Sequence, residues 1–344
     1  MIRNDAKLAR MVECLSKLKL SLACWDYDRV WALIDGTVRP KGIDLNILCM
    51  PVEETFFRLM RHQEFDVAEC SASSYLIARD RGYPKYTAIP VFLSRSFRHS
   101  GIYVNTRAGI TKPEDLRGKR IGLPEYQLTA CVWIRGFLEH EYGVAASDVL
   151  WFKGGQETPG RVEKMELDLP PDIRVQDIGP DETLNAMLEA GEIDALISPR
   201  APSAFLKGSP HVKRLFDDYV SVEMEYYRKT GIFPIMHVVV IRDEILERHP
   251  WVAANLYQAF VEAKQRVYDG FNQTAAPKVT LPWLTSEVER AKELMGEDFW
   301  PYGLEENRTT LEALIQYSHE QGLIKRKPKV EELFSKSTLE KFKI

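Results

Sequence analysis

The fold is decided near the start of the chain, by residues 18–47, LKLSLACWDYDRVWALIDGTVRPKGIDLNI. Apolar and polar residues alternate over Leu18–Leu22 and again over Ile43–Ile47, which predicts two strands. Between them, residues 30–34 predict a short helix that ends at Gly36. A strand, a helix and a strand joined by short connections predict an α/β fold with a mostly parallel sheet.

The same alternation continues through two sets of elements, the second of which begins after a strand at 102–104. The expected helices of both sets are 53–62, 73–81, 128–142 and 182–190. The further expected strands are 65–68, 86–92, 120–123, 149–152, 173–178, 195–198 and 235–241. The last third of the chain is expected to be helical, over 244–270, 286–295, 306–322 and 330–339.

Two extended segments, near 102–106 and 234–241, are expected to cross between two lobes. We therefore predict a two-lobed α/β protein with a helical C-terminal region. Residues 18–103 and 236–344 are expected to form lobe one, and residues 104–235 lobe two. Folds of this kind bind ligands between the lobes, where strands end and helices begin, so the active site is expected in that cleft.

Length and composition exclude several classes of protein. The chain has 344 residues, of which 45% are hydrophobic and 28% charged, and its formal net charge is −4. Dedicated nucleic-acid-binding proteins are usually basic, so no nucleic-acid partner is expected. No apolar run approaches the roughly 18 residues that cross a bilayer, so no membrane partner is expected. The five cysteines include no CxxC spacing, which argues against a disulfide framework and a structural zinc site.

The N-terminal segment, residues 1–17, is expected to be a polar extension. A secretory signal needs an uninterrupted apolar core, and charged residues break every candidate stretch here. Ser21-Leu22-Ala23-Cys24 resembles a lipoprotein cleavage site only faintly, because two lysines precede it and a strand pattern runs through it. We therefore expect a cytoplasmic protein whose cysteines are reduced.

The densest polar cluster is Ser94-Arg95-Ser96-Phe97-Arg98-His99-Ser100, which lies between two expected strands. Arginine can grip a carboxylate with two parallel hydrogen bonds, and histidine titrates near neutral pH. The cluster therefore predicts an anion site, and a solvated surface loop is the alternative.

Further candidates lie mostly at the ends of expected strands and at the start of the long helix. They are Asp28, Glu69, Ser71, Ser73, Tyr126, Gln127, Arg161 and Arg200. The serines can offer hydroxyls and helix-end amides to an anion, or can simply cap a helix. His237 lies inside an apolar strand, where a histidine is more often a core residue than a ligand-binding one.

Several motifs resemble those of one family. They are Asp26-Tyr27-Asp28-Arg29, Asp35-Gly36-Thr37-Val38, Glu53-Glu54-Thr55-Phe56-Phe57-Arg58, Phe97-Arg98-His99-Ser100, Pro124-Glu125-Tyr126-Gln127, His249-Pro250-Trp251-Val252-Ala253 and residues 294–303, LMGEDFWPYG. On these residues the chain resembles the 4,5-dihydroxyphthalate decarboxylases, over about residues 18–334. The resemblance implies a fold like that of type 2 periplasmic binding proteins, in agreement with the two lobes expected from the strand pattern.

The resemblance implies a reaction that converts 4,5-dihydroxyphthalate to protocatechuate and CO2. Such a site needs clamps for two carboxylates, an acid aimed at a ring carbon, and a group that takes or polarises a phenolic proton. The expected clamps are Arg95 and Arg98, assisted by Arg161 or Arg200. The expected proton donor is His99, with His237 as the second choice, and Glu69 or Asp28 is expected to act on the phenolic proton. Ser71, Ser73, Tyr126 and Gln127 are expected to contact the substrate.

Other interpretations remain open. The ligand is expected to be a small aromatic carboxylate, and no organic cofactor is expected. A divalent metal ion on the two hydroxyls is an alternative to the carboxylate base, and a homo-oligomer is also open. A non-catalytic solute-binding protein for an aromatic carboxylate, or another cytoplasmic enzyme on the same scaffold, are the alternative functions.

Overall fold

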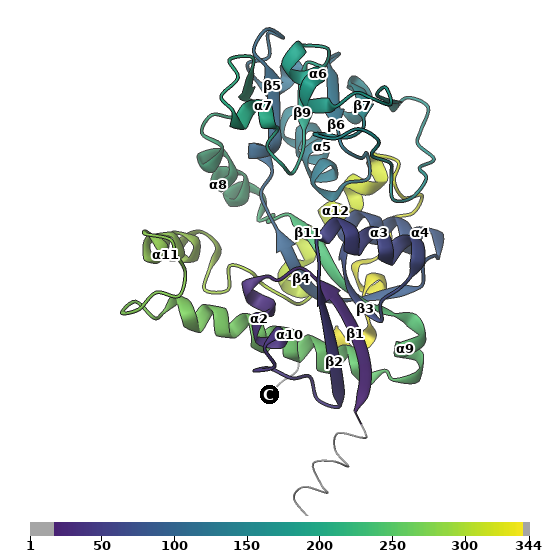
Figure 1. Ribbon diagram of the computed structural model, residues 1–344, viewed down its shortest axis with the longest axis vertical. Helices are drawn as coiled ribbons and strands as arrows, with labels where there is room; N and C mark the ends of the chain where they lie inside the picture. Colours follow the sequence, from purple (N-terminus) through teal and green to yellow (C-terminus); the bar gives the residue numbers. More distant parts are fainter. Residues whose placement is uncertain (1–16, 340–344) are drawn as a thin grey trace, which may run out of the picture.

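The computed structural model describes residues 17–339 and contains two β-sheets surrounded by helices (Figure 1). The first sheet has the strand order β2-β1-β3-β11-β4, and the second has the order β10-β5-β9-β6-β7-β8. The strands of the first sheet are β1 (Leu18–Cys24), β2 (Ile43–Cys49), β3 (Val67–Ser71), β4 (Tyr86–Arg95) and β11 (Ile235–Arg242). Those of the second are β5 (Ile102–Asn105), β6 (Arg120–Leu123), β7 (Leu150–Lys153), β8 (Arg174–Asp177), β9 (Ala195–Ile197) and β10 (Val212–Arg214). The chain leaves the first sheet after β4 and returns in β11, so two connections join the sheets.

Most of the helices lie where the sequence predicts them. These are α2 (Asp28–Ile34), α3 (Val52–His62), α4 (Ala72–Arg81), α5 (Thr129–Tyr142), α6 (Leu184–Ala190), α11 (Leu284–Met295) and α12 (Arg308–Glu320). One strand and two α-helices were not expected, namely β10, α7 (Ser203–Leu206) and α8 (Tyr219–Thr230). The predicted N-terminal extension lies outside the described residues except for Lys17.

Two of the expected C-terminal helices differ from the prediction. The helix expected over 244–270 is divided into α9 (Asp243–Arg248) and α10 (Trp251–Phe271). The break falls before Pro250, which has no amide hydrogen to donate to a continuing helix. The helix expected over 330–339 consists of two short 3₁₀ turns, at Val330–Leu333 and Lys336–Thr338.

The first sheet is mixed, and the prediction of a mostly parallel sheet is wrong for β11. β1 is parallel to β2 and β3, whereas β11 is antiparallel to β3 and β4. The register of β11 on β3 places His237 opposite Ser71 and Val239 opposite Glu69. Side chains two residues apart on a strand lie on the same face of a sheet. His237 and Glu69 are therefore diagonal neighbours on one face, although 168 residues separate them in the chain.

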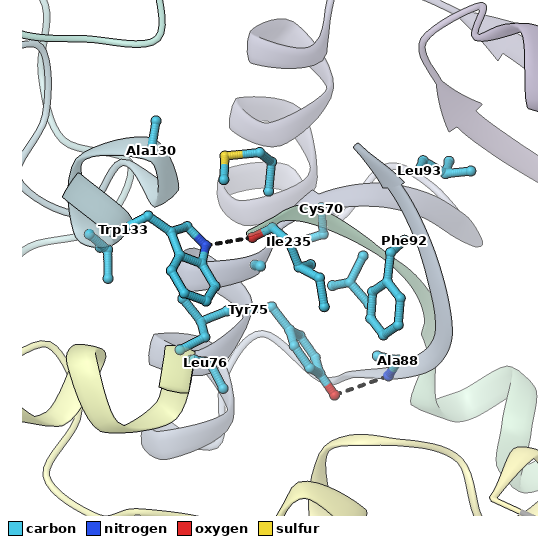
Figure 2. Packing of buried hydrophobic residues seen from close by; sticks show 14 of the residues in the cluster. Cys70, Tyr75, Leu76, Ala88, Phe92, Leu93, Ala130, Trp133 and Ile235 are labelled. Atoms are coloured by element: carbon cyan, nitrogen blue, oxygen red, sulfur yellow. Dashed lines mark hydrogen bonds between the residues drawn. The ribbon is translucent and has the colours of Figure 1, made fainter. Parts of the chain in front are cut away.

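Buried aromatic residues pack the region where the two sheets meet (Figure 2). Trp133 of α5 donates its indole N–H to the carbonyl of Ile235 at 2.8 Å, which joins a helix beside the second sheet to the returning strand β11. Tyr75 of α4 accepts a hydrogen bond from the amide of Ala88 at 3.0 Å. Both rings bury a large apolar area while their polar atoms stay paired, so they fix the positions of α4, α5 and β11 relative to one another.

Candidate active site

A cavity of about 370 Å³ lies between the two sheets, and both sides contribute side chains to it. The side of the first sheet and its connections provides Trp25, Tyr27, Pro51, Val52, Glu53, Phe56, Ser71, Ser94, Arg98, Met236 and His237. The side of the second sheet provides Leu128, Thr129, Ala130, Lys164, Pro199 and Arg200. Small-molecule pockets usually measure about 300–1,000 Å³, so the cavity suits a small aromatic acid.

A buried carboxylate fixes a histidine at one side of this cavity. Oε1 of the fully buried Glu69 lies 2.6 Å from Nδ1 of His237 and accepts a hydrogen bond from the Tyr27 hydroxyl at 2.7 Å. Its Oε2 accepts the amide of Trp25 at 3.0 Å. Nε2 of His237 makes no hydrogen bond within residues 17–339, and His237 lines the cavity. A ring held at Nδ1 presents Nε2 to a ligand, which is the arrangement of a general acid or base.

The Glu69 carboxylate stays charged in spite of its burial. Burial alone would raise its pKa, but the facing His237 and the hydrogen bonds that the carboxylate accepts hold the pKa of Glu69 below its ordinary value. Burial and the negative charge of Glu69 raise the pKa of Tyr27, so the tyrosine hydroxyl keeps its proton and donates it. Phe56 packs edge-on against the His237 ring, with 4.7 Å between ring centroids. The imidazole is therefore fixed by a charge on one side and an aromatic ring on another.

Three cationic side chains line the cavity, and they differ in what they already bind. Arg98 has no carboxylate partner within the described chain, and its hydrogen bond goes to a methionine sulfur. Burial lowers the pKa of Arg98 to about 10, so the guanidinium stays charged at neutral pH. Lys164 is paired with the buried Glu125, and Arg200 with Glu53 at 3.3 Å. Arg98 is thus the cation that a carboxylate can reach without displacing a partner.

The starts of two helices add hydroxyl groups and amides to the site. α4 begins directly after Ser71 and α5 begins at Thr129, and the hydroxyl oxygens of these residues lie 2.8 Å apart. Both residues line the cavity, as does Ala130 in the first turn of α5. The first amides of a helix have no intrahelical acceptor, and the helix dipole favours negative charge there. The start of α5 therefore offers a second place for a carboxylate.

The expectation that His99 faces the cleft is wrong. The residue is 1% exposed, and its ring stacks on Phe137 at 4.1 Å between centroids, with Phe216 and Tyr226 packed edge-on against it. Neither ring nitrogen has a hydrogen-bond partner in the described part of the chain. Burial lowers the pKa of His99 to about 4, so the imidazole is neutral at physiological pH. Between the two candidate proton donors, only His237 contacts the cavity.

Arg95 also points away from the cavity, although it is only three residues from Arg98. Its guanidinium is buried against the C-terminal part of the chain. There it donates to the carbonyls of Phe233 at 3.2 Å and Pro301 at 3.1 Å, and to the side chain of Asn307. The expectation that Arg95 clamps a carboxylate is wrong, because its guanidinium is buried away from the cavity and both terminal nitrogens already donate to other groups.

Four other predicted site residues lie outside the cavity lining. Asp28 is exposed and pairs with the neighbouring Arg29 at 2.8 Å. Ser73 donates to the carbonyl of Gln127. The Gln127 side chain donates to Glu163 at 2.8 Å, and the Tyr126 hydroxyl donates to a backbone carbonyl of the C-terminal region. The expectation that these four side chains line the cleft is wrong. Asp28 is exposed beside its neighbour Arg29, and the other three are engaged in contacts between separate segments.

Arg161 lies beside the cavity, not in it. It lines a neighbouring cavity of about 310 Å³, which shares Glu53, Leu128, Pro199 and Arg200 with the first. Its guanidinium pairs with Glu125 at 2.6 Å and with Glu53 at 3.2 Å. Of the predicted ligand-binding residues, Arg98, Ser71 and Arg200 reach the first cavity directly.

Tyr27, Thr129 and Lys164 are cavity residues that the sequence did not single out. Tyr27 stands next to the predicted Asp28, and Thr129 is two residues beyond the predicted Gln127, so a strand end and a helix start marked both positions. Lys164 lies in an irregular segment between β7 and β8, where no periodic pattern indicates the path of the chain.

Two further features of residues 17–339 bear on ligand chemistry and location. No three His, Cys, Asp or Glu side chains of this range are gathered so that they could hold a metal ion. Each helix of the range is too short or too polar to span a bilayer.

Two curated relatives carry the printed name 4,5-dihydroxyphthalate decarboxylase. The one from Comamonas testosteroni is 45% identical over 330 residues, which cover 96% of this chain and 100% of the relative. The chain belongs to the 4,5-dihydroxyphthalate decarboxylase family. The family member from Pseudomonas putida is 47% identical over 221 residues, which cover 64% of this chain and 86% of the relative. The family resemblance that the sequence motifs indicated is therefore confirmed.

The fold expected for this decarboxylase family is confirmed as well. A family model described as "ABC transporter, phosphonate, periplasmic substrate-binding protein" matches residues 38–158. The periplasmic aliphatic sulphonate binding protein SsuA from Escherichia coli is similar with a TM-score of 0.53 and 14% identity, over 96% of this chain and 95% of that one. The desulfurization enzyme DSZB gives a TM-score of 0.50 and 14% identity, over 92% and 96%. Because a binding protein and an enzyme share the fold, the fold alone does not determine the chemistry.

Proposed function

We propose that this protein converts 4,5-dihydroxyphthalate to protocatechuate and CO2, in keeping with the name of its relatives. The observation that carries the proposal is the placement of His237. Its Nδ1 is held by the buried Glu69, and the ring lines a cavity that also contains the unpartnered cation Arg98. A proton donor and a free cation facing one cavity are two of the groups that removal of a carboxylate from an aromatic ring requires.

The reaction is easiest when a proton arrives before CO2 leaves. Direct loss of CO2 from the ring would leave an aryl anion. The hydroxyl para to the departing carboxylate can instead release its proton to solvent, from which the phenolate recovers a proton at the end, and push electrons into the ring. The carboxylate-bearing carbon then takes up a proton and gives a dienone. The bond to the carboxylate breaks next, and its electron pair restores the aromatic ring and the phenolate. The overall change consumes one proton, which ends on the ring carbon.

His237 is the proposed donor of that proton. When the ring is charged, its Nδ1–H is bound by Glu69 and its Nε2–H is available to the cavity. Glu69 stabilises the imidazolium and fixes its orientation without touching the ligand, because the carboxylate is fully buried. A well-placed acid contributes about 100- to 10,000-fold to the rate.

The remaining cavity residues hold and desolvate the ligand. Arg98 can bind one carboxylate with two parallel hydrogen bonds, and the first amides of α5 near Ala130 can support the same anionic edge. Lys164 also lines the cavity, with its charge paired to the buried Glu125. Trp25 and Phe56 line the cavity with aromatic surface, which excludes water and strengthens these electrostatic interactions.

Turnover by the purified protein tests this proposal. Incubation with 4,5-dihydroxyphthalate should release CO2 and protocatechuate in equal amounts. Phthalate, which lacks the para hydroxyl, should bind and stay intact. Binding of 4,5-dihydroxyphthalate without release of CO2 would contradict the proposal and support a solute-binding protein. Absence of both binding and turnover would support another enzyme on the same scaffold.

We also propose that the reaction takes place in the cytoplasm and uses no organic cofactor. The chemistry consists of proton transfer and cleavage of one bond, with no net oxidation. Within residues 17–339 the four cysteines are free, which suits a reducing compartment. A divalent ion on the two hydroxyls is the alternative way to stabilise the phenolate. Cell fractionation tests the location, and turnover before and after chelation, with metal analysis of the protein, tests the use of an ion.

A further inference from the structure

Glu53 stands where the active-site cavity meets the neighbouring cavity. It lines both, as does Arg200. Its carboxylate pairs with Arg200 at 3.3 Å and with Arg161 at 3.2 Å. Glu53 belongs to α3 on the side of the first sheet, whereas both arginines lie in the segments around the second sheet. The two ion pairs therefore cross from one side of the molecule to the other at the edge of the active site.

Besides the start of α5, a ligand with two carboxylates can use a second cation, and the two cations of the cavity other than Arg98 are not equally available. Lys164 is bound to Glu125, and both side chains are 0% exposed, so separating them would leave buried charges poorly paired. The side chains of Arg200 and Glu53 are 67% and 34% exposed, and such a solvated pair contributes little to stability. When Arg200 moves away, Glu53 keeps its second partner. Arg200 is therefore the cation that can change partners.

We propose that Glu53 is a specificity-determining residue, which competes with the second carboxylate of the ligand for Arg200. The inference rests on the proposed function for the kind of ligand. An ortho-dicarboxylate binds Arg98 and draws Arg200 away from Glu53. Once one carboxylate has left as CO2, the product retains a single carboxylate for Arg98, and Arg200 returns to Glu53. Arg200 thereby favours dicarboxylates over monocarboxylates, whereas Glu53 lowers the affinity for dicarboxylates and takes Arg200 back once the product has formed.

Calorimetric binding of phthalate and benzoate tests this inference without any turnover, because neither ligand carries the hydroxyl that the reaction needs. Glu53→Gln should bind phthalate roughly fivefold more tightly, since no exposed ion pair has to open. Arg200→Gln should weaken phthalate binding by a similar factor and leave benzoate unchanged. In the double variant, phthalate should bind as in Arg200→Gln alone, because Glu53 acts through Arg200. The matched control is Glu54→Gln, since Glu54 pairs with Arg58 at 2.9 Å outside the cavity and should have no effect.

Three results would overturn the inference. They are an unchanged phthalate affinity in Glu53→Gln, a Glu53 effect that persists in the double variant, and equal losses of phthalate and benzoate binding in Arg200→Gln. Failure of the unsubstituted protein to bind phthalate would overturn it too. A protein that passes these binding tests but releases no CO2 from 4,5-dihydroxyphthalate contradicts the proposed function while the role of Glu53 in carboxylate recognition is supported.

Discussion

Two histidines lie near the junction of the sheets, and their surroundings are opposite. His237 has a buried carboxylate 2.6 Å from Nδ1 and lines a cavity. His99 is enclosed by Phe137, Phe216 and Tyr226, and neither of its nitrogens has a hydrogen-bond partner within residues 17–339, although Nδ1 lies 4.0 Å from Glu223. Yet His99 stands in the most polar stretch of the sequence, while His237 stands in an apolar strand. The difference shows that the partner of an imidazole, and not the polarity of its neighbours in sequence, decides whether it can transfer a proton.

Replacing each histidine in turn should give the largest difference, in the rate of decarboxylation. His237→Asn should lower the rate of decarboxylation about 100- to 10,000-fold, because the proton donor is lost. His99→Phe should keep the activity at neutral pH, since the His99 ring does not reach the cavity. Initial rates of CO2 release measure both.

The matched control for His237→Asn is His140→Asn, because His140 also pairs with a glutamate, Glu320 at 2.8 Å, but lies near the surface. Its turnover should stay normal. Normal turnover in His237→Asn, or a loss of activity in folded His99→Phe, would return the catalytic role to His99.

The burial of His99 can also be tested by measuring how the free energy of unfolding depends on pH. Burial lowers the pKa of His99 from an ordinary value of 6.5 to about 4, so the unfolded chain takes up a proton at a higher pH than the folded chain does. The free energy of unfolding should therefore fall as the pH drops from 6.5 toward 4, by about 3 kcal/mol at the acid end. His99→Phe should show a flatter dependence in this window. Urea unfolding at several pH values measures it, and parallel curves for the two proteins would contradict the burial argument.

A second, smaller difference is expected between Arg98, which lines the cavity, and Arg95, which is buried away from it. Arg98→Gln should raise the KM for 4,5-dihydroxyphthalate about 10- to 100-fold, because a charged hydrogen-bond partner of the carboxylate is removed. Arg95→Gln should leave KM nearly unchanged and lower the free energy of unfolding, because the contacts of Arg95 to the C-terminal region are lost. Steady-state kinetics and urea unfolding distinguish them. Equal changes in KM would show that both arginines touch the ligand.

The smallest expected effect concerns the hydroxyl pair between the starts of α4 and α5. Thr129→Val removes the contact with Ser71 at 2.8 Å and the hydrogen bond from the Ser73 amide at 3.2 Å. The free energy of unfolding should fall by about 1–2 kcal/mol. Thr285→Val, at an exposed position of α11, is the control and should leave stability unchanged. An equal effect of both substitutions would mean that the contact between α4 and α5 adds no stability.

The periodic patterns predicted most elements because apolar residues recur at one spacing in strands and at another in helices. The strand expected over 18–22 is β1, and the apolar run at 235–241 is β11. β10 has only three residues, which is too short for a periodic signal. The direction of β11 also could not be predicted, because an apolar run has the same pattern whichever way it enters the sheet.

The active site was predicted in part. Glu69 could be named because it lies at the end of an expected strand, and His237 because it lies in an expected crossover. Their contact depends on the register of β11 on β3, and no local pattern encodes a pairing across 168 residues. The polar cluster around Arg98 was found by its composition. Which of its side chains face the ligand is decided by distant partners, such as Asn307 for Arg95. Composition therefore located the region, and tertiary contacts determined the orientation.

His237 lies in a strand of the first sheet, whereas two of the cationic groups of the cavity, Lys164 and Arg200, lie on the side of the second sheet. His237 and Glu69 belong to strands of one sheet, so their hydrogen bond survives any rigid rotation of the second sheet. Lys164 and Arg200, which lie on the side of the second sheet, would travel with that rotation. The pairing of the proton donor with Glu69 is therefore preorganised before a substrate arrives. Little reorganisation energy then falls on the chemical step itself.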